Sequence, residues 1–342
     1  MSREERRHPA AFPLDDRSIY DAYVTGRQSA ALTVGVRVGL FDKLDQTPLD
    51  VQSVAAEFDF SLRGARSLLV ALEAMGVVIC KEGLYGLSPE AAAYAVHGRS
   101  GSLVSLIELE MDHFLSPVAL LDALKKDGST AYGDADPWEE HERDPEAAAR
   151  FTAAMHSVSE RPAAGFAEVA PLDGIKRLLD VGGGSGALCL ACAAAFPELT
   201  CTVWDLEVVC ELAREYAQKA GLSERVQTLA GDMWNEPFPT GYDAVLLSQI
   251  LHDWSHEQGG VLLEKAFACL PKGGRVLINE KLVDEDGGPL ANALVNLDML
   301  VWTKGQQYTA AELEGLLVAA GFVDVQCEPS AGYWSVVSAR KP

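Results

Sequence analysis

The stretch that decides the fold is Leu178-Leu179-Asp180-Val181-Gly182-Gly183-Gly184-Ser185-Gly186, in which an apolar run leads directly into a cluster of glycines. An alanine-rich segment follows at 187–196, so the pattern predicts a strand, a tight turn and a helix. Glycines allow the backbone to turn sharply and allow a ligand to approach it with no Cβ in the way. Asp205 ends the next apolar run, where its carboxylate can accept hydrogen bonds from both hydroxyls of a ribose. The glycine loop and the acid together indicate a nucleoside cofactor.

Length and charge limit what the chain can do. Its 342 residues, 48% of them hydrophobic, suffice for two domains with cores of ordinary size. The formal net charge of −22 repels phosphate backbones and anionic membranes, so we expect neither nucleic acid nor a membrane as a partner. No apolar run reaches the ~20 residues that span a bilayer. The charged stretch 1–7 predicts no secretory signal, and we therefore expect a cytoplasmic protein.

The seven cysteines are scattered through apolar stretches. Only Cys189 and Cys192 lie close together, and neither a second cysteine pair nor a histidine pair accompanies them. Zinc sites need four such ligands, so the sequence predicts buried, reduced thiols and no metal.

The pattern changes near residue 165, which divides the chain into predicted domains 1–164 and 165–342. The first is mainly helical: segments 51–58 and 62–75 predict a pair of helices, and alternation over 77–87 predicts a β-hairpin. Two helices and a hairpin form a winged-helix outline. The second helix carries only two basic residues, which argues against DNA binding. The alternative is that this element packs against a second subunit or covers an active site.

The second predicted domain alternates strands and helices. Strands are predicted at 177–181, 201–204, 226–230, 244–248 and 275–279. Helices between them are predicted at 187–196, 207–220 and 256–270. This alternation predicts an α/β fold, with a parallel sheet covered on both faces. The last two apolar runs, 322–327 and 333–338, are joined by a short turn and should pair antiparallel.

Four polar residues end predicted strands or follow soon after them. They are Asp205, Asp232, His252 and Glu280. In an open α/β sheet, ligands bind beyond the carboxyl ends of the strands. We therefore expect these four side chains to project onto one rim of the sheet and to form the site.

Six segments, in order and with matching spacing, resemble the S-adenosylmethionine-dependent O-methyltransferases, a family that includes plant caffeic acid and animal acetylserotonin O-methyltransferases. The segments are 179–186, 231–234, 251–254, 272–280, 296–300 and 320–322. The resemblance implies a class I methyltransferase fold for 165–342, with S-adenosylmethionine as the cofactor. It also implies that 1–164 is a winged-helix-like domain that forms a homodimer and covers the substrate.

Carried over residue by residue, the resemblance assigns the cofactor to loop and strand-end residues. These are Asp180, Gly182, Gly184, Asp205, Leu206, Gly231, Asp232, Met233, Ser248 and Ser159. Asp205 suits the ribose, while Asp232 and Met233 would bracket the adenine. Ser248 is a departure, because many relatives carry Lys or Arg at this position.

Methyl transfer to oxygen needs an aligned acceptor and a nucleophile. A phenol has a pKa near 10, so a base assists at neutral pH, and His252 with an ordinary pKa of ~6.5 suits that role. The resemblance implies that Glu280 orients the other ring nitrogen of His252. Relatives usually carry a second Glu where this chain has Gln307, whose amide is uncharged. We therefore expect His252 to stay a free base at lower pH than in those relatives.

The acceptor pocket is expected between the two predicted domains. By resemblance, it would be lined by Met155, His156, Asp253, Met299 and Trp302. Methionine and tryptophan form an adaptable apolar slot for a flat ring. In the polar stretch 125–145, Tyr132 and Trp138 are further candidates for lining a site. The predicted acceptor is thus a hydroxyl of a small aromatic molecule of the phenol, hydroxyindole or polyketide type.

Three alternatives remain open from the sequence. A nicotinamide-dependent oxidoreductase also uses a glycine loop and an acid, yet it leaves the later motifs unexplained. Some relatives use bound S-adenosylmethionine for hydroxylation or decarboxylation, and those typically lack the histidine. Methylation of carbon or nitrogen is the third, because an activated phenol is also a carbon nucleophile.

Overall fold

The computed structural model describes residues 15–110, 116–126, 129–131, 138 and 143–342. The chain forms two compact units, Met1–His97 and Gly98–Pro342. The division between them, at 97/98, comes well before the predicted boundary at 164/165. The reason is that helix α9 (Pro145–Val169) packs against α10 (Ala187–Ala195) and α6 (Val104–Glu110), which ties the intervening helices to the second unit. The change of sequence pattern marks where the sheet begins, and the packing changes earlier.

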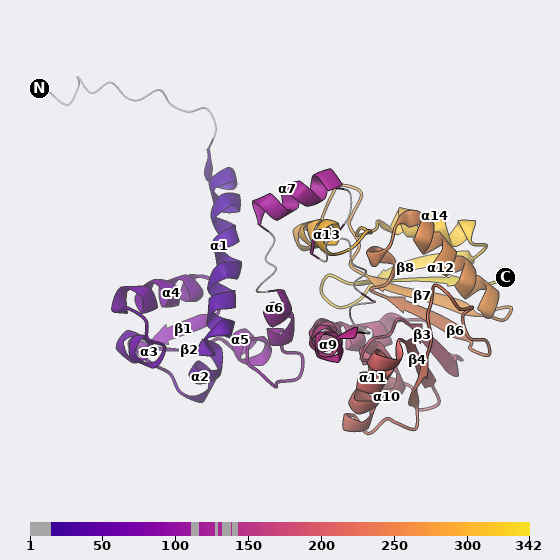
Figure 1. Ribbon diagram of the computed structural model, residues 1–342, viewed down its shortest axis with the longest axis horizontal. Coiled ribbons are helices and arrows are strands. Elements are labelled where there is room, and N and C mark those ends of the chain that lie inside the picture. Colours follow the sequence, from indigo (N-terminus) through magenta and orange to yellow (C-terminus); the bar gives the residue numbers. More distant parts are fainter. Residues whose placement is uncertain (1–14, 111–115, 127–128, 132–137, 139–142) are drawn as a thin grey trace, which may run out of the picture. The chain divides into compact units, whose positions relative to one another are not determined.

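The N-terminal unit consists of short helices and one hairpin (Figure 1). The helices are α1 (Arg17–Arg37), α2 (Leu40–Gln46), α3 (Val51–Glu57), α4 (Leu62–Ala74) and α5 (Pro89–Tyr94). Strands β1 (Val78–Lys81) and β2 (Leu84–Leu87) pair antiparallel, as the alternation predicts. Side chains of Asp50 and Ser61 accept hydrogen bonds from the first turns of α3 and α4, which fixes where these two helices begin.

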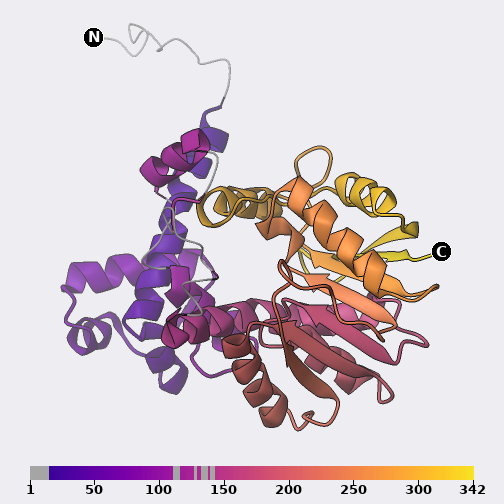
Figure 2. The same cartoon turned by 45° about the vertical axis from the view of Figure 1, so that its right-hand side comes forward.

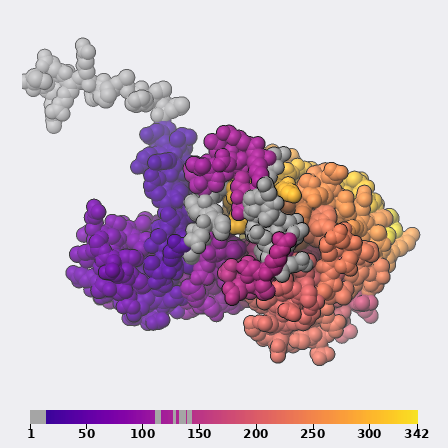
Figure 3. Space-filling view, viewed as in Figure 1, coloured from indigo at the N-terminus to yellow at the C-terminus, as the bar shows by residue number. Residues whose placement is uncertain are grey.

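The first turns of α1 stand clear of the rest of the N-terminal unit (Figure 3). Three large side chains on this part of the helix, Ile19, Tyr20 and Tyr23, are 76%, 61% and 66% exposed. Adjacent apolar side chains with this exposure are typical of a surface that binds another protein.

The second unit is built on a seven-stranded sheet in the order β5-β4-β3-β6-β7-β9-β8. Five strands are parallel: β3 (Arg177–Val181), β4 (Thr200–Asp205), β5 (Val226–Ala230), β6 (Ala244–Ser248) and β7 (Arg275–Glu280). The last two, β8 (Val323–Pro329) and β9 (Ser335–Arg340), pair antiparallel with each other, and β9 pairs antiparallel with β7. From β3 the strand order runs through β4 to β5 on one side, and from β6 it runs through β7 toward β9 and β8 on the other side. The strand order therefore reverses between β3 and β6. The carboxyl ends of these two strands flank the crevice where such sheets bind ligands.

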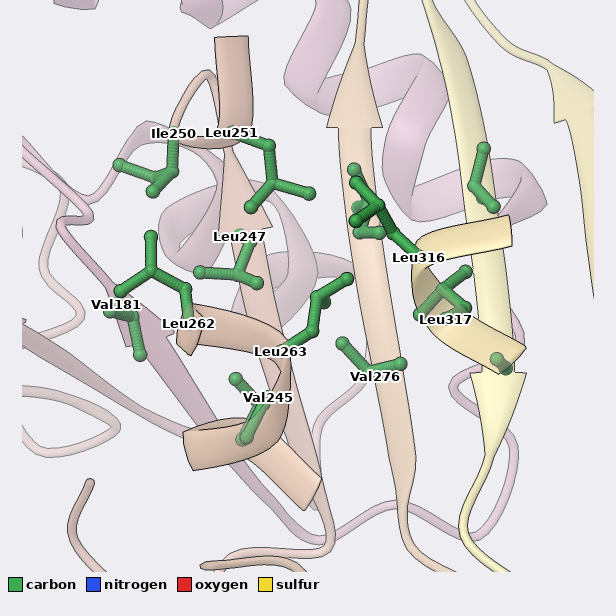
Figure 4. Close-up of a cluster of buried hydrophobic side chains, with 14 of the residues drawn as sticks. Val181, Val245, Leu247, Ile250, Leu251, Leu262, Leu263, Val276, Leu316 and Leu317 are labelled. Carbon is green, nitrogen blue, oxygen red and sulfur yellow. The ribbon is translucent and has the colours of Figure 1, made fainter. Parts of the chain in front are cut away.

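Helices cover both faces of this sheet (Figure 2). Helices α9, α10 and α11 (Glu207–Lys219) pack on one face, and α12 (His256–Cys269) and α14 (Ala310–Ala319) pack on the other. Strand residues alternate between the two cores: Leu178 faces the first, while Leu179 faces the second. Figure 4 shows the second core, where Leu262 and Leu263 of α12 lie among side chains of β3, β6 and β7. The predicted α/β fold is confirmed.

Two further helices complete the unit: α7 (Pro117–Lys126) packs on α13 (Leu290–Trp302). Among the described residues, no helix is long and apolar enough to cross a membrane. Within the same part of the chain, no three His, Cys, Asp or Glu side chains gather as a metal ion would require. The seven cysteines are free thiols, and most of them are buried.

Candidate active site

The glycine loop follows β3 at the crevice between β3 and β6. Gly182, Gly184 and Gly186 have φ values of 64°, 56° and 74°, a left-handed region that favours glycine. A Cβ at Gly182 would lie 2.5 Å from a side-chain carbon of Ile250, so this glycine permits the loop to pass close to the segment after β6. A Cβ at Gly184 would meet no atom within 4 Å. Gly184 therefore faces open space, and its backbone is accessible to a ligand.

Asp205 ties this loop to the end of β4. Its Oδ2 accepts a hydrogen bond from Gly184 N at 2.9 Å, and its Oδ1 accepts one from Leu206 N at 2.7 Å. Each carboxylate oxygen has a further lone pair that can accept from a ligand hydroxyl. Burial raises the pKa of Asp205 to about 6, and the two backbone hydrogen bonds limit that rise. At neutral pH the group is thus an anionic acceptor.

Asp180, at the end of β3, is buried beside the loop with unused hydrogen-bonding capacity. Its Oδ2 accepts from Cys189 Sγ at 3.3 Å, whereas Oδ1 has no hydrogen-bond partner among the described residues. Burial raises the pKa of Asp180 to about 7. A buried acceptor without a partner carries a free-energy cost that a donor group of a ligand would remove.

A cavity of about 360 Å³ opens beside this loop. Every described residue that lines it belongs to the second unit, on both sides of residue 165. Predicted cofactor residues in its wall are Asp180, Gly182, Gly184, Asp205, Leu206, Ser248 and Ser159. Predicted catalytic and acceptor residues in its wall are His252, Gln307, Met155, Asp253, Met299 and Trp302. Trp138 also lines the cavity, and Tyr132 lies outside the described residues.

Other predicted cofactor residues lie outside this wall. Asp232 stabilises the turn after β5: one of its oxygens accepts from Trp234 N at 2.7 Å, and the other accepts from Asn235 Nδ2 at 2.6 Å. Burial acts to raise the pKa of Asp232, but these hydrogen bonds lower it by more, so the pKa lies below its usual value. Gly231 is packed against the Trp204 ring, with which a Cβ would collide. The backbone carbonyl of Met233 accepts a hydrogen bond from Lys265 Nζ at 2.6 Å.

His156 also points elsewhere than the acceptor pocket. Its ring stacks on Tyr216 with 4.0 Å between centroids, and its Nδ1 lies 2.8 Å from Ser185 Oγ in the glycine loop. Burial lowers the pKa of His156. A neutral His156 therefore supports the loop from behind, while its neighbour Met155 faces the cavity.

His252 lies on a short 3₁₀ turn, Leu251–Asp253, after β6. Its Nδ1 is 3.1 Å from Glu280 Oε2 and 3.1 Å from the Gln307 amide, and its Nε2 is 3.5 Å from Asp253 Oδ1. Glu280 is only 1% exposed, lies outside the cavity wall and accepts a hydrogen bond from Ile250 N at 3.1 Å. One carboxylate at the end of β7 thus fixes both the turn and the imidazole ring.

The environment of His252 is more anionic than the sequence argument assumed. Burial lowers the pKa of His252, but the carboxylates of Glu280 and Asp253 raise it by more, to about 9. The expectation that His252 stays a free base at lower pH than in relatives with Glu in place of Gln307 stays a prediction, and within this protein Glu280 and Asp253 favour the imidazolium. Burial also raises the pKa of Asp253, to about 6.

Proton balance determines how Gln307 faces the imidazole. A ring whose Nδ1 carries a proton toward Glu280 can bind an amide only through the amide oxygen. The two ends of a side-chain amide have the same shape, so the hydrogen-bond partners decide their orientation. The Gln307 backbone N–H donates to Asn296 Oδ1 at 2.7 Å, which holds this segment against α13.

Sequence reasoning missed several polar residues of the wall. Gln249, directly after β6, has a φ of 55° and donates from Nε2 to Ser159 Oγ at 2.8 Å. Lys281, Asp298 and Glu110 also line the cavity. Only Lys281 carried a signal, because it follows Glu280 at the end of a strand. The other two lie on helices, where tertiary packing decides which face meets the cavity.

The comparisons with known proteins agree with this architecture. An O-methyltransferase domain model matches residues 119–323, and an O-methyltransferase dimerisation domain model matches residues 23–97. The chain is 35% identical over 305 residues to a 3-hydroxy-5-methyl-1-naphthoate 3-O-methyltransferase of Streptomyces sahachiroi, covering 87% of each chain. It is 30% identical to acetylserotonin O-methyltransferase of Gallus gallus, covering 92% of this chain and 94% of that one.

A solved structure extends the similarity to three dimensions. Human N-acetylserotonin methyltransferase in complex with S-adenosylmethionine superposes with a TM-score of 0.86 at 27% identity, covering 98% of this chain and 99% of that one. Both family models and the glycine loop at the sheet crevice lead to the same conclusion. The chain belongs to the family of S-adenosylmethionine-dependent O-methyltransferases.

Proposed function

We propose that the protein methylates a hydroxyl of a small aromatic acceptor, with His252 as the general base. The observation that carries this proposal is the position of His252. Its ring lies in the wall of the same cavity as the glycine loop and Asp205, while Glu280 engages its Nδ1 from behind. When the imidazole is neutral and its Nδ1 carries the proton toward Glu280, Nε2 can take a proton from the acceptor.

The loop half of the cavity fits the cofactor. Asp205 offers two oxygens that can accept from ribose hydroxyls, and the open face of Gly184 leaves room for close approach. Asp180 Oδ1, without a partner among the described residues, suits the ammonium of an amino-acid group. When bound there, S-adenosylmethionine supplies an activated methyl group on a sulfonium. We assign the adenine to the Asp232 and Met233 turn at the end of β5.

The residues of the chain orient the acceptor and move its proton. Met155, Met299 and Trp302 provide apolar walls against which a flat ring can lie. As the acceptor oxygen bonds to the methyl carbon and the carbon–sulfur bond breaks, the hydroxyl proton passes to His252 Nε2. Glu280 and Asp253 stabilise the imidazolium that results.

The relatives favour an aromatic acceptor. One is named for a hydroxylated naphthoate and another for acetylserotonin, both flat aromatic hydroxyl compounds. We propose that this chain takes an acceptor of the same general class. Oxygen is the acceptor atom that the family implies, and product analysis distinguishes it from ring carbon or nitrogen.

We also propose a homodimer formed through the N-terminal unit, which the dimerisation domain model and the exposed α1 side chains support. The free cysteines suit a reducing compartment, so we propose that the enzyme works in the cytoplasm. The net charge of −22 supports a small-molecule acceptor and argues against nucleic acid as a partner.

The test replaces the base and keeps the binding site. His252→Ala should lower kcat by about 10²–10⁴-fold, the usual contribution of a positioned base, and leave the affinity for S-adenosylhomocysteine within a few-fold. His256→Ala is the matched control, because His256 is exposed on α12 and does not line the cavity. Product formation from a panel of phenols and hydroxyindoles is followed by mass spectrometry. Normal turnover in His252→Ala would show that alignment alone suffices.

A further inference from the structure

Three charged side chains in the cavity wall are not used by the proposed mechanism. Glu110 lies at the end of α6, Lys281 directly follows β7, and Asp298 lies in α13. Among the described residues, neither a hydrogen bond nor a direct ion pair joins any of the three to another group. The Lys281 ammonium instead lies 5.1 Å from the centre of the Trp334 ring. Three elements therefore bring two carboxyl groups and one ammonium to one cavity, where Lys281 interacts electrostatically with both acids and leaves one negative charge in excess.

Lys281 and Asp298 are half-buried where they face the cavity, and Glu110 is more exposed at the end of its helix. Burial raises the pKa of Glu110 to about 7 and that of Asp298 to about 6, and it lowers the pKa of Lys281. For Lys281 and Asp298, the shifts agree with their partial burial, which disfavours the charged form. Charges in such surroundings are retained at a cost in folding free energy, and a ligand of complementary charge removes that cost.

The three groups belong to the acceptor half of the cavity. Lys281 adjoins Glu280, and its positive charge opposes the rise in the pKa of His252. Asp298 adjoins Met299, one of the apolar residues of the wall. Asp180 and Asp205, in the loop half, do not contribute to the shifts of Glu110 or Asp298. A group held by this set therefore lies near the methyl acceptor and away from the nucleoside.

The charges of Glu110, Asp298 and Lys281 decide which substituent of the acceptor fits beside them. A carboxylate of the acceptor would meet one attraction and two repulsions, and a neutral tail would leave the excess negative charge of the set unbalanced. A cation would meet two attractions and one repulsion, and the repelling Lys281 is already held at the Trp334 ring. The net charge of −22 further raises the local concentration of cations.

We propose that the acceptor is an aromatic hydroxyl compound with a protonated amine, which binds between Glu110 and Asp298. The proposal rests on the function proposed above and specifies the substrate class of the same site. The two carboxylates are specificity residues, since they bind the amine and take no part in moving the hydroxyl proton. Lys281 adds discrimination by repelling cations that are displaced from the carboxylates.

Matched acceptors that differ only in the tail test this assignment. One set is serotonin, N-acetylserotonin and 5-hydroxyindole-3-acetate, and a second is tyramine, 4-ethylphenol and 3-(4-hydroxyphenyl)propionate. With saturating S-adenosylmethionine, the cationic member of a set should have the highest kcat/KM, by about 10–100-fold, as expected for a charged hydrogen bond. The ratio between the cationic and neutral members is the measured quantity.

Variants show whether the two carboxylates are responsible. Asp298→Asn and Glu110→Gln should each reduce the ratio by about 10-fold or more. Glu285→Gln removes the same charge from an exposed residue that does not line the cavity, and it should leave the ratio unchanged. Affinity for S-adenosylhomocysteine, measured for every variant, verifies that the protein is folded.

The outcomes separate this inference from the function on which it rests. Methylation of neutral or anionic members in preference to cationic ones would overturn the amine assignment and leave the methyltransferase function intact. A cationic preference that survives in both Asp298→Asn and Glu110→Gln would also overturn it. Absence of methyl transfer to any hydroxyl compound of a wider panel would overturn the proposed function itself.

Discussion

At the scale of single residues, His252 has to satisfy two opposing requirements. It must be neutral to accept a proton, yet Glu280 and Asp253 hold its pKa at about 9 in the ligand-free protein. A positive charge placed in the cavity disfavours the imidazolium and so lowers this pKa. The sulfonium of the cofactor is such a charge, whereas the thioether of the product is neutral.

We therefore predict that S-adenosylmethionine lowers the pKa of His252 more than S-adenosylhomocysteine does. The two ligands share every other group, so their difference isolates the effect of the sulfonium. Nuclear magnetic resonance titration of the His252 ring gives both values, and the exposed His256 serves as the internal reference. Equal pKa values in the two complexes would place the sulfonium away from His252.

Gln307 tunes the same equilibrium. Gln307→Glu would place a third carboxylate near His252, where the Gln307 amide now lies 3.1 Å from Nδ1. Because an added negative charge favours the imidazolium, the pKa of His252 should rise above about 9, and the acidic limb of the pH–rate profile should move to higher pH. Affinity for the cofactor should be unchanged.

The neighbouring residue supplies the control for that experiment. Gln306→Glu adds the same charge on an exposed side chain that does not line the cavity, so it should leave the profile unchanged. Equal profiles for Gln307→Glu and the parent protein, with equal acceptor preference, would remove Gln307 from the active site.

At the scale of elements, substitutions in the glycine loop affect both the backbone conformation and the contact with the cofactor, and these two effects can be measured separately. Gly184→Val should abolish cofactor binding, because the new side chain extends from a residue of the cavity wall. It should also destabilise the fold by about 1–2 kcal/mol, the cost of an ordinary residue in the left-handed region. Calorimetry with S-adenosylmethionine measures the binding.

Gly221 is a matched control position that lies away from the proposed cofactor site. Its φ is 69°, a Cβ there would also meet no atom within 4 Å, and it lies in the turn after α11, outside the cavity wall. Gly221→Val should lose a similar amount of stability and retain cofactor binding. Retained binding in Gly184→Val would mean that the cofactor does not approach this part of the loop.

The elements of the second unit were predictable because each carries a strong local signal. Strands β3, β6 and β7 are mostly buried apolar runs, and all five parallel strands begin and end within one residue of the predicted positions. The last two strands each end two residues later than predicted, because Arg340 pairs with Val323 and Arg275 and its guanidinium binds the Asp324 carboxylate. Hydrophobic patterns do not report such polar ends.

The polar contacts of the site were only partly predictable. His252 and Glu280 were placed together because His252 follows β6 and Glu280 ends β7, and these two parallel strands are neighbours. The positions of Glu110 and Asp298 depend on how α6 and α13 pack. The sequence alone does not specify which face of these helices turns toward the cavity. His156 illustrates the reverse case, because one position along α9 turns it from the cavity to Tyr216.

At the scale of the whole molecule, the N-terminal unit carries an exposed apolar face on α1 that the proposed dimer would bury. Ile19 and Tyr23 are four positions apart on α1 and therefore share one face of that helix. Leaving such side chains in water is unfavourable, and a two-fold interface would bury them in both subunits at once. The dimerisation domain model covers residues 23–97, which include Tyr23 and begin just after Ile19.

We predict that the full chain is a dimer at micromolar concentration and that a double variant, Ile19→Glu with Tyr23→Glu, is monomeric. Two carboxylates on the shared face of α1 would have to be desolvated at the interface, which opposes association. Light scattering measures the mass of each protein, and Gln28→Glu on the same helix is the control, since it adds charge without removing an apolar side chain. A monomeric parent protein would contradict the proposed dimer. A double variant that stays dimeric would place the interface elsewhere on the N-terminal unit, because Ile19 and Tyr23 would then remain in contact with water.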